Sequence, residues 1–136
     1  LPTPRRAVIG WDANRLAMMI AVLNARFGLN LLDKEVYLNV VGGLKVTEPA
    51  ADLAVMAALI SSAKNAAISS KYVFFGEIGL SGEVRQVVNH DIRINEALKL
   101  GFEKVFIPTQ TKKTGVKTQK DAICITHVKE LSMIFN

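Results

Sequence analysis

The sequence predicts an α/β (α+β) fold, with helices packed on a mixed sheet, because strand-like and helix-like segments alternate along the chain. Half of the 136 residues are apolar, which is enough to form the hydrophobic core of one domain. We expect helices at residues 12–27, 48–64, 91–100 and 128–134, and strands at residues 35–41, 72–78, 83–88, 104–107 and 122–126.

The first predicted helix has a start signal, an apolar face and a stop signal. Asp12 is a good amino-terminal cap, and Gly28 can end the helix in a left-handed conformation. The apolar residues recur at helical spacing and should face the core: Leu16, Met19, Ile20, Leu23 and Phe27.

The next strand and helix are separated by Gly42 and Gly43. The strand at 35–41 carries apolar residues on both faces, so we expect it to be buried. Thr47 is the expected cap of the helix at 48–64, and Pro49 is tolerated in its first turn. Glu48 and Asp52 share one face of this helix, and we expect structural roles for both.

The second half of the chain predicts a hairpin, a helix and two further strands. The strands at 72–78 and 83–88 are joined by the turn Gly79-Leu80-Ser81-Gly82. Asp91 should open the following helix and Gly101 should end it. Cys124 alternates with two isoleucines in a strand, which favours a small core residue.

The chain ends and the composition indicate the domain boundary, the cellular setting and the charge of possible partners. Residues 1–10 are expected to be a linker that precedes a domain at 11–136, and the absence of an initial Met indicates a fragment of a longer protein. No apolar run approaches the ~18 to 20 residues that cross a bilayer. Cys124 is the single cysteine, which excludes an internal disulfide and indicates a cytoplasmic setting. The net charge of +5 favours anionic partners.

Most signatures of catalytic and cofactor sites are missing from the sequence. It has no phosphate-binding loop, no His-Glu-x-x-His and no Gly-x-Ser-x-Gly. His90 and His127 are far apart and lack the spacing of metal ligands, so we predict surface or capping roles for both and no metal site.

Two segments nevertheless resemble the proteolytic domain of Lon-type proteases. They are Gly42-Gly43-Leu44-Lys45-Val46-Thr47-Glu48-Pro49-Ala50-Ala51-Asp52 and Gly76-Glu77-Ile78-Gly79-Leu80-Ser81-Gly82-Glu83-Val84-Arg85. The resemblance places Ala50 at the position of the Lon nucleophilic serine and Asp91 at the position of the catalytic lysine. It also implies a Lon protease-like fold.

These replacements predict a degenerate protease site. A Ser–Lys mechanism needs an oxygen nucleophile and a neutral amine that takes its proton, and neither Ala50 nor Asp91 provides one. Ser61, Ser62, Ser69, Ser70, Ser81 and Ser132 remain, but none has a convincing base nearby in the sequence. An active Lon-like Ser/Lys peptidase with a displaced site is the alternative.

The combination of a Lon framework with these replacements resembles the carboxy-terminal domain of the bacterial RadA (Sms) family over about residues 5–135. The motif Gly10-x-Asp12-x-Asn14-Arg15-Leu16 resembles that domain too. The resemblance implies a non-catalytic scaffold that supports a hexameric ring and DNA binding in recombination, branch migration and repair. It also implies that ATP, Mg and Zn sites lie elsewhere in the full-length protein, and that this chain holds no cofactor.

If DNA is the partner, basic side chains are the candidates for phosphate contacts. Four of them cluster in the polar segment between Ile107 and Asp121, and the alternative is that this segment is simply solvated. Arg85 and Arg93 could bind DNA, or could pair with Glu83 or a neighbouring subunit. The full set of candidates is Lys112, Lys113, Lys117, Lys120, Arg85, Arg93, Arg5, Arg6 and Arg15. An oligomerisation module without DNA contact remains a third possibility.

Overall fold

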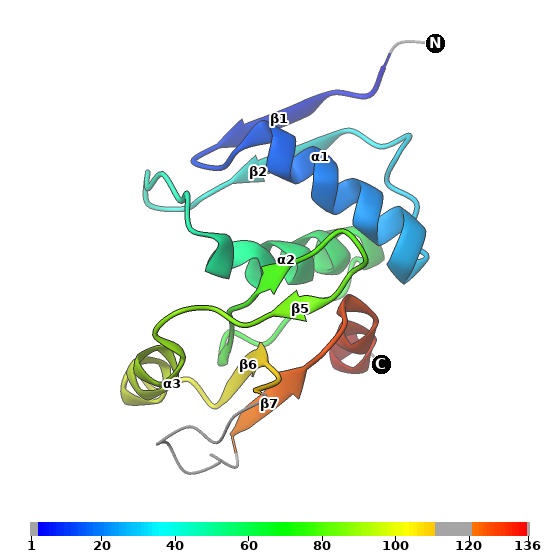
Figure 1. Ribbon diagram of the computed structural model, residues 1–136. Coiled ribbons are helices and arrows are strands. Elements are labelled where there is room, and N and C mark those ends of the chain that lie inside the picture. Colours follow the sequence, from blue (N-terminus) through cyan, green and yellow to red (C-terminus); the bar gives the residue numbers. More distant parts are fainter. Residues whose placement is uncertain (1–2, 111–120, 136) are drawn as a thin grey trace.

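The computed structural model describes residues 3–110 and 121–135, and the predicted α/β class is confirmed (Figure 1). The chain begins with β1 (Arg6–Ile9), α1 (Ala13–Val22) and β2 (Val36–Asn39). The helix α2 (Asp52–Lys64) lies across the middle of the molecule. The second half contains β3 (Tyr72–Phe74), β4 (Glu77–Ile78), β5 (Val84–Arg85), α3 (His90–Lys99), β6 (Lys104–Pro108), β7 (Ala122–Ile125) and the 3₁₀ helix η3 (Val128–Phe135).

In the described residues the strands form three small sheets and not one mixed sheet. β1 and β2 pair in parallel, β3, β6 and β7 form a parallel sheet in the order β3-β6-β7, and β4 and β5 form an antiparallel hairpin. The predicted turn at Gly79–Gly82 is confirmed, because the Gly82 amide donates to the Gly79 carbonyl at 2.9 Å. The expected strand at 72–78 breaks at Phe75 and Gly76, so its two parts join different sheets.

Helix ends follow the predicted capping chemistry in part. The Asp12 carboxylate accepts a hydrogen bond from the Arg15 amide at 3.1 Å. The helix continues past α1 as the π-helical turn η1 (Leu23–Phe27) and ends at Gly28, whose φ is 83°. Thr47 does not cap the next helix. Glu48 precedes the 3₁₀ turn η2 (Pro49–Ala51), which leads into α2.

The strand β1 lies within residues 1–10 and pairs Arg6 with Val36 of β2. Two expectations about exposure are wrong. β2 is not buried on both faces: Tyr37 is 63% exposed, because this two-stranded sheet is covered on one side only. Cys124 is exposed, because it lies on the face of the edge strand β7 opposite to the buried Ile125.

Two hydrophobic clusters hold the elements together. The larger one joins α1, α2, β2 and η3 through fully buried residues that include Leu16, Leu53 and Leu131. The smaller one lies between α3 and the β3–β6 strands and includes Ile94 and Val105. The helix α2 therefore lies between the β1–β2 sheet and the β3–β6–β7 sheet (Figure 1).

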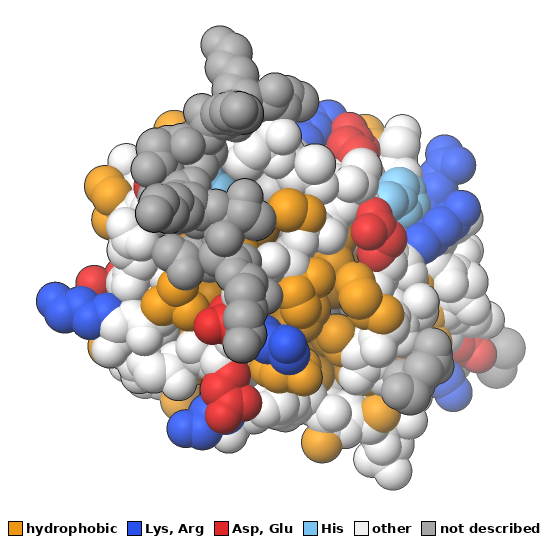
Figure 2. Space-filling model, turned by 90° about the horizontal axis from the view of Figure 1, so that it is seen from below, with side chains coloured by type: hydrophobic (Ala, Val, Ile, Leu, Met, Phe, Trp, Pro, Cys, Tyr) orange, Lys and Arg blue, Asp and Glu red, His pale blue; other side chains and the backbone are white. Residues whose placement is uncertain are grey.

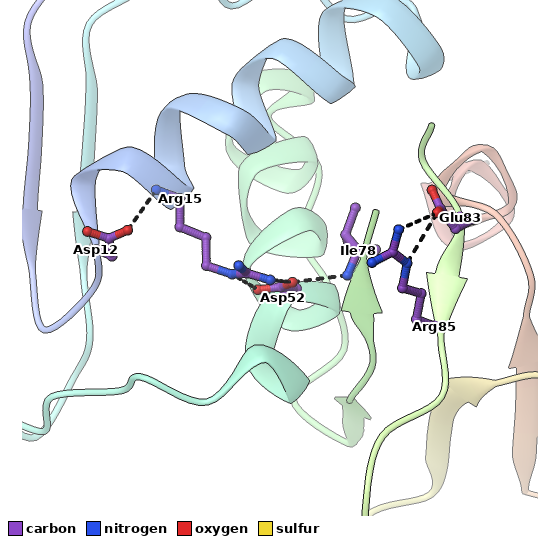
Figure 3. A network of polar contacts seen from close by, with 6 residues as sticks. All are labelled: Asp12, Arg15, Asp52, Ile78, Glu83 and Arg85. Carbon is purple, nitrogen blue, oxygen red and sulfur yellow. Dashed lines mark hydrogen bonds and ion pairs between the residues drawn. The ribbon is translucent and has the colours of Figure 1, made fainter. Parts of the chain in front are cut away.

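Asp52 is a fully buried acidic residue at the start of α2. Its carboxylate accepts hydrogen bonds from Nε and Nη2 of Arg15 on α1, and from the backbone amide of Ile78 on β4 at 3.0 Å (Figure 3). The hydrogen bond to Asp52 is the main cause that raises the pKa of Arg15 above its ordinary value. The guanidinium is therefore charged wherever the protein is folded, and one carboxylate ties together three elements.

Removing Arg15 should destabilise the fold strongly. An Arg15→Met change leaves the buried Asp52 carboxylate without its cation, and we expect the free energy of unfolding to fall by about 3 to 5 kcal/mol. The double change Arg15→Met with Asp52→Leu should lose less, because no uncompensated charge remains buried. Urea denaturation of the unmodified chain, Arg15→Met, Asp52→Leu and the double variant measures the coupling free energy between Arg15 and Asp52.

Arg85 provides a matched control for this prediction. It also holds a carboxylate, that of Glu83, but both side chains are largely exposed. Arg85→Met should therefore cost about 1 kcal/mol or less. The interpretation that a buried ion pair organises the fold would be contradicted if Arg15→Met and Arg85→Met lost equal free energy of unfolding. It would also be contradicted if the variant with both Arg15→Met and Asp52→Leu were no more stable than Arg15→Met.

Candidate functional site

The two degenerate positions, Ala50 and Asp91, lie in segments that contact each other. Ala50 belongs to the η2 turn and Asp91 to the first turn of α3. An ion pair joins the two segments, because Arg93, two residues after Asp91, binds the Glu48 carboxylate, two residues before Ala50. The structure thus places the two segments that carry these positions in contact with each other.

The backbone around Ala50 is fixed by hydrogen bonds to the break between β3 and β4. The Ala50 carbonyl accepts from the Gly76 amide at 2.8 Å, and the Leu53 amide donates to the Gly76 carbonyl at 3.0 Å. Gly76 has a φ of 152°, and a β-carbon there would lie 2.8 Å from Val84. The Ala50 side chain itself is buried, at 3% exposure.

The start of α3 packs against Phe75. The His90 ring meets the Phe75 ring edge-on, with centroids 5.5 Å apart, and the Arg93 guanidinium lies 5.9 Å from the same ring. Arg93 Nε also donates to the Val88 carbonyl at 2.9 Å. Nδ1 of His90 and Oδ1 of Asp91 are buried and have no hydrogen-bond partner within the described part of the chain.

The residues at these two positions do not supply the groups that a Ser–Lys mechanism needs. Ala50 has no nucleophilic atom, and Asp91 carries a carboxyl group where an amine would be required. Two of the remaining serines have structural partners: the Ser61 hydroxyl donates to the Ala66 carbonyl at 2.6 Å, and Ser69 Oγ accepts from the Lys71 amide at 3.1 Å.

Four of the five candidate arginines already bind groups of the protein. Arg15 holds Asp52, Arg93 holds Glu48 and Arg85 holds Glu83. Arg6 donates to three backbone carbonyls in the loop before β2, and Arg5 is exposed. The four candidate lysines, Lys112, Lys113, Lys117 and Lys120, lie outside the described residues.

The lower face of the molecule carries a mixture of charges over its described part. Figure 2 shows hydrophobic side chains gathered near the middle of this face, while Lys and Arg side chains lie mostly toward its rim, close to Asp and Glu. Glu83 illustrates this pairing. Its own backbone amide, and then Arg85, lower the pKa of its carboxyl group.

Two hollows were not indicated by the sequence. One has a volume of about 530 Å³ and lies beside Trp11, Arg15 and Lys45. The other, of about 580 Å³, lies between β2 and α2. Both arise from the way that separate elements pack, and a one-dimensional pattern carries no signal for them.

Within residues 3–110 and 121–135, no group of three or more His, Cys, Asp or Glu side chains could hold a metal ion. Over the same residues, no helix is long and apolar enough to cross a membrane.

His90 should make stability depend on pH between about 7.5 and 5.5. Burial lowers the pKa of this imidazole below its ordinary value, against an opposing effect of Asp91. The unfolded chain therefore takes up the proton more readily, so the free energy of unfolding should decrease as the pH falls through the ordinary value of about 6.5. Urea midpoints across this range measure the slope, and His90→Gln should flatten it. A slope that is unchanged in this variant would assign the effect to another group.

Comparisons with known proteins agree with the predicted resemblance. A family model described as subunit ChlI of Mg-chelatase matches residues 12–111. The DNA repair protein RadA of Rickettsia bellii is 50% identical over 132 residues, which is 97% of this chain and 29% of that protein. The RadA proteins of Brucella abortus and Pseudomonas aeruginosa are 53% and 43% identical over 79% and 96% of this chain.

The chain spans under a third of the length of these relatives, 29% of the Rickettsia and Pseudomonas proteins and 23% of the Brucella protein. The family model covers most of the chain, including α1, α2, α3 and both degenerate positions. The chain therefore belongs to the family described as subunit ChlI of Mg-chelatase, and its relatives over nearly its whole length are DNA repair proteins named RadA.

Proposed function

We propose that this chain is a non-catalytic, Lon protease-like scaffold domain of a RadA-type DNA repair protein. In this role it supports assembly of a hexameric ring and DNA binding during recombination, branch migration and repair. The observation that carries the proposal is that the fold brings Ala50 and Asp91 into neighbouring segments, while neither supplies the chemistry of a Ser–Lys pair.

The packing around the two positions supports a structural role for them. The Ala50 side chain is buried, its own carbonyl accepts a hydrogen bond from the Gly76 amide, and the Glu48–Arg93 ion pair joins η2 to α3. A small side chain at position 50 fits this environment. The order of helices and strands around these segments is compatible with the Lon-like fold that the resemblance implies.

DNA is the proposed partner because the relatives are named DNA repair proteins and the chain is basic. Four candidate arginines bind groups of the chain itself, which shifts the emphasis to Lys112, Lys113, Lys117 and Lys120. We place the ATP, Mg and Zn sites in other parts of the full-length protein, whose setting would be the cytoplasm.

The isolated chain should not hydrolyse unfolded protein substrates. Incubation with fluorescently labelled casein should give no release above a heat-denatured control, because position 50 lacks a nucleophile. Cleavage by the unmodified chain would overturn the proposal in favour of a peptidase, and its loss in Ser61→Ala or Ser81→Ala would then locate the displaced nucleophile.

DNA binding should depend on the four lysines of residues 112–120. Changing all four to Gln reduces the net charge from +5 to +1, and we expect at least tenfold weaker binding of a labelled duplex at 50 mM salt. A control protein with Lys64, Lys71, Lys99 and Lys129 changed to Gln has the same net charge and should bind nearly as tightly as the unmodified chain. Sedimentation velocity at two salt concentrations measures both bound DNA and assembly.

Equal losses in the two quadruple variants would mean that net charge alone, and not this segment, attracts DNA. An assembled chain that leaves DNA free at both salt concentrations would favour the alternative of an oligomerisation module. A monomer that leaves DNA free would assign assembly and DNA affinity to the rest of the longer protein.

A further inference from the structure

The groove of about 580 Å³ between β2 and α2 lies away from the degenerate protease positions. Its α2 side is formed by the carboxy-terminal half of that helix, whereas Ala50 precedes the first turn of the same helix. Its opposite wall contains every residue of β2, Val36–Asn39. Its volume is in the range of clefts that hold ligands, roughly 300 to 1,000 Å³.

The strand β2 presents an unpaired edge to this groove. The Val36 amide donates to the Arg5 carbonyl at 3.0 Å, and the Val40 amide donates to the Ile9 carbonyl at 2.9 Å. Since backbone groups alternate in direction along a strand, those of Tyr37 and Asn39 point away from β1. Within the described residues β2 pairs with β1 alone, so these donors and acceptors are free for another strand.

The floor of the groove is formed by Ala58, Leu59, Ser62 and Ala63, so it is mostly apolar and most of its side chains are small. Leu59 is nearly buried, while Ala58 and Ala63 are exposed and leave space above the helix. A strand placed beside β2 at the usual spacing of about 4.8 Å would direct every second side chain onto this floor. Small and medium apolar side chains at alternate positions would bury area there.

The walls of the groove are already held in place. Arg6 Nη2 donates to the carbonyls of Leu31 and Leu32 at 3.0 and 3.1 Å, which fixes the loop at one end. The Tyr37 hydroxyl donates to the Glu35 carboxylate at 2.6 Å, and this bond is the main cause that raises the pKa of Tyr37. A partner would therefore meet a preformed site, with little loop-ordering entropy to lose on binding.

The charge of the lining distinguishes between classes of partner. Among the described residues that line it, Lys34 and Glu35 alone are charged and have opposite signs, although the whole chain carries +5. A nucleic acid would gain little here, because phosphate contacts need an excess of positive charge. A helical segment would leave the edge groups of Tyr37 and Asn39 unpaired, since its own backbone bonds are internal.

A second copy of the chain fits this edge poorly. If β2 paired with the β2 of a second copy around a two-fold axis, each copy's α2 would lie beneath the β2 strand of the other copy. The axes of the two α2 helices would then be only as far apart as two neighbouring strands, ~4.8 Å. Packed helices need 8 to 10 Å between their axes. The groove therefore suits a strand that brings no helix of its own.

We propose that this groove binds an extended, uncharged segment of another protein, which adds to β2 as a strand and places alternate apolar side chains on α2. Backbone hydrogen bonds to Tyr37 and Asn39 would hold the segment, and the floor at Ala58, Leu59 and Ala63 would select small apolar side chains. This interaction surface goes beyond the proposed scaffold function and does not depend on it.

A titration with a short peptide tests the proposal on the 136-residue chain. The probe is acetyl-Ser-Val-Ser-Val-Ser-amide, followed by ¹⁵N–¹H correlation spectra. We expect the largest shifts at the Tyr37 and Asn39 amides. Ala58→Arg, which fills the groove from an exposed position, should weaken binding at least tenfold. Ala17→Arg, an equally exposed change on α1 outside the groove, should leave it unaltered, and thermal melts check that both variants fold.

Three outcomes would overturn the proposal. The first is that the peptide leaves the Tyr37 and Asn39 amides unshifted, or binds Ala58→Arg as tightly as the unmodified chain. The second is that these amides shift with protein concentration alone and Ala58→Arg abolishes this, which would make a second copy the occupant. The third is that a DNA duplex shifts the same amides.

A probe with all five residues N-methylated lacks every backbone donor that could pair with β2 and should bind at least tenfold more weakly.

Discussion

The buried carboxylate of Asp52 is the constraint on which the arrangement of the other elements depends. Its two oxygens connect α1 through Arg15, β4 through the Ile78 amide, and α2 through its own backbone. A charged group without solvent must have these partners, because an unpaired carboxylate in the interior costs several kcal/mol. Each partner is therefore held at hydrogen-bonding distance, and the position of α2 between the two parallel sheets follows from it.

The position of the degenerate site follows from the same constraint. Ala50 and its turn precede Asp52 directly, and the Leu53 amide binds Gly76 on the chain segment that leads to Ile78. The turn is thus fixed on one side by the buried carboxylate and on the other by the break between β3 and β4. The ion pair from Arg93 to Glu48 adds α3 to this arrangement.

Local signals predicted much of the fold, and long-range packing accounts for what they missed. Asp12, Gly28 and the Gly79–Gly82 turn were correctly assigned, since each acts on its own neighbours in sequence. The exposure of Tyr37 and Cys124 was not predicted, because it depends on which faces of their sheets other elements cover. Ala50 and Asp91 were singled out by resemblance. The sequence makes Arg15 a candidate for DNA contact, but it does not show that Asp52 is buried beside it.

The basic residues of this chain illustrate how little a count of charges says about a binding surface. Arg15, Arg85 and Arg93 contribute three of the positive charges, yet each neutralises a carboxylate of the same chain. Arg6 is used to order the loop that forms one wall of the groove beside β2. Guanidinium groups are suited to such roles, because their planar donors match carboxylates and neighbouring carbonyls. These four arginines therefore serve the architecture of the chain, and their number does not measure a surface for an anionic partner.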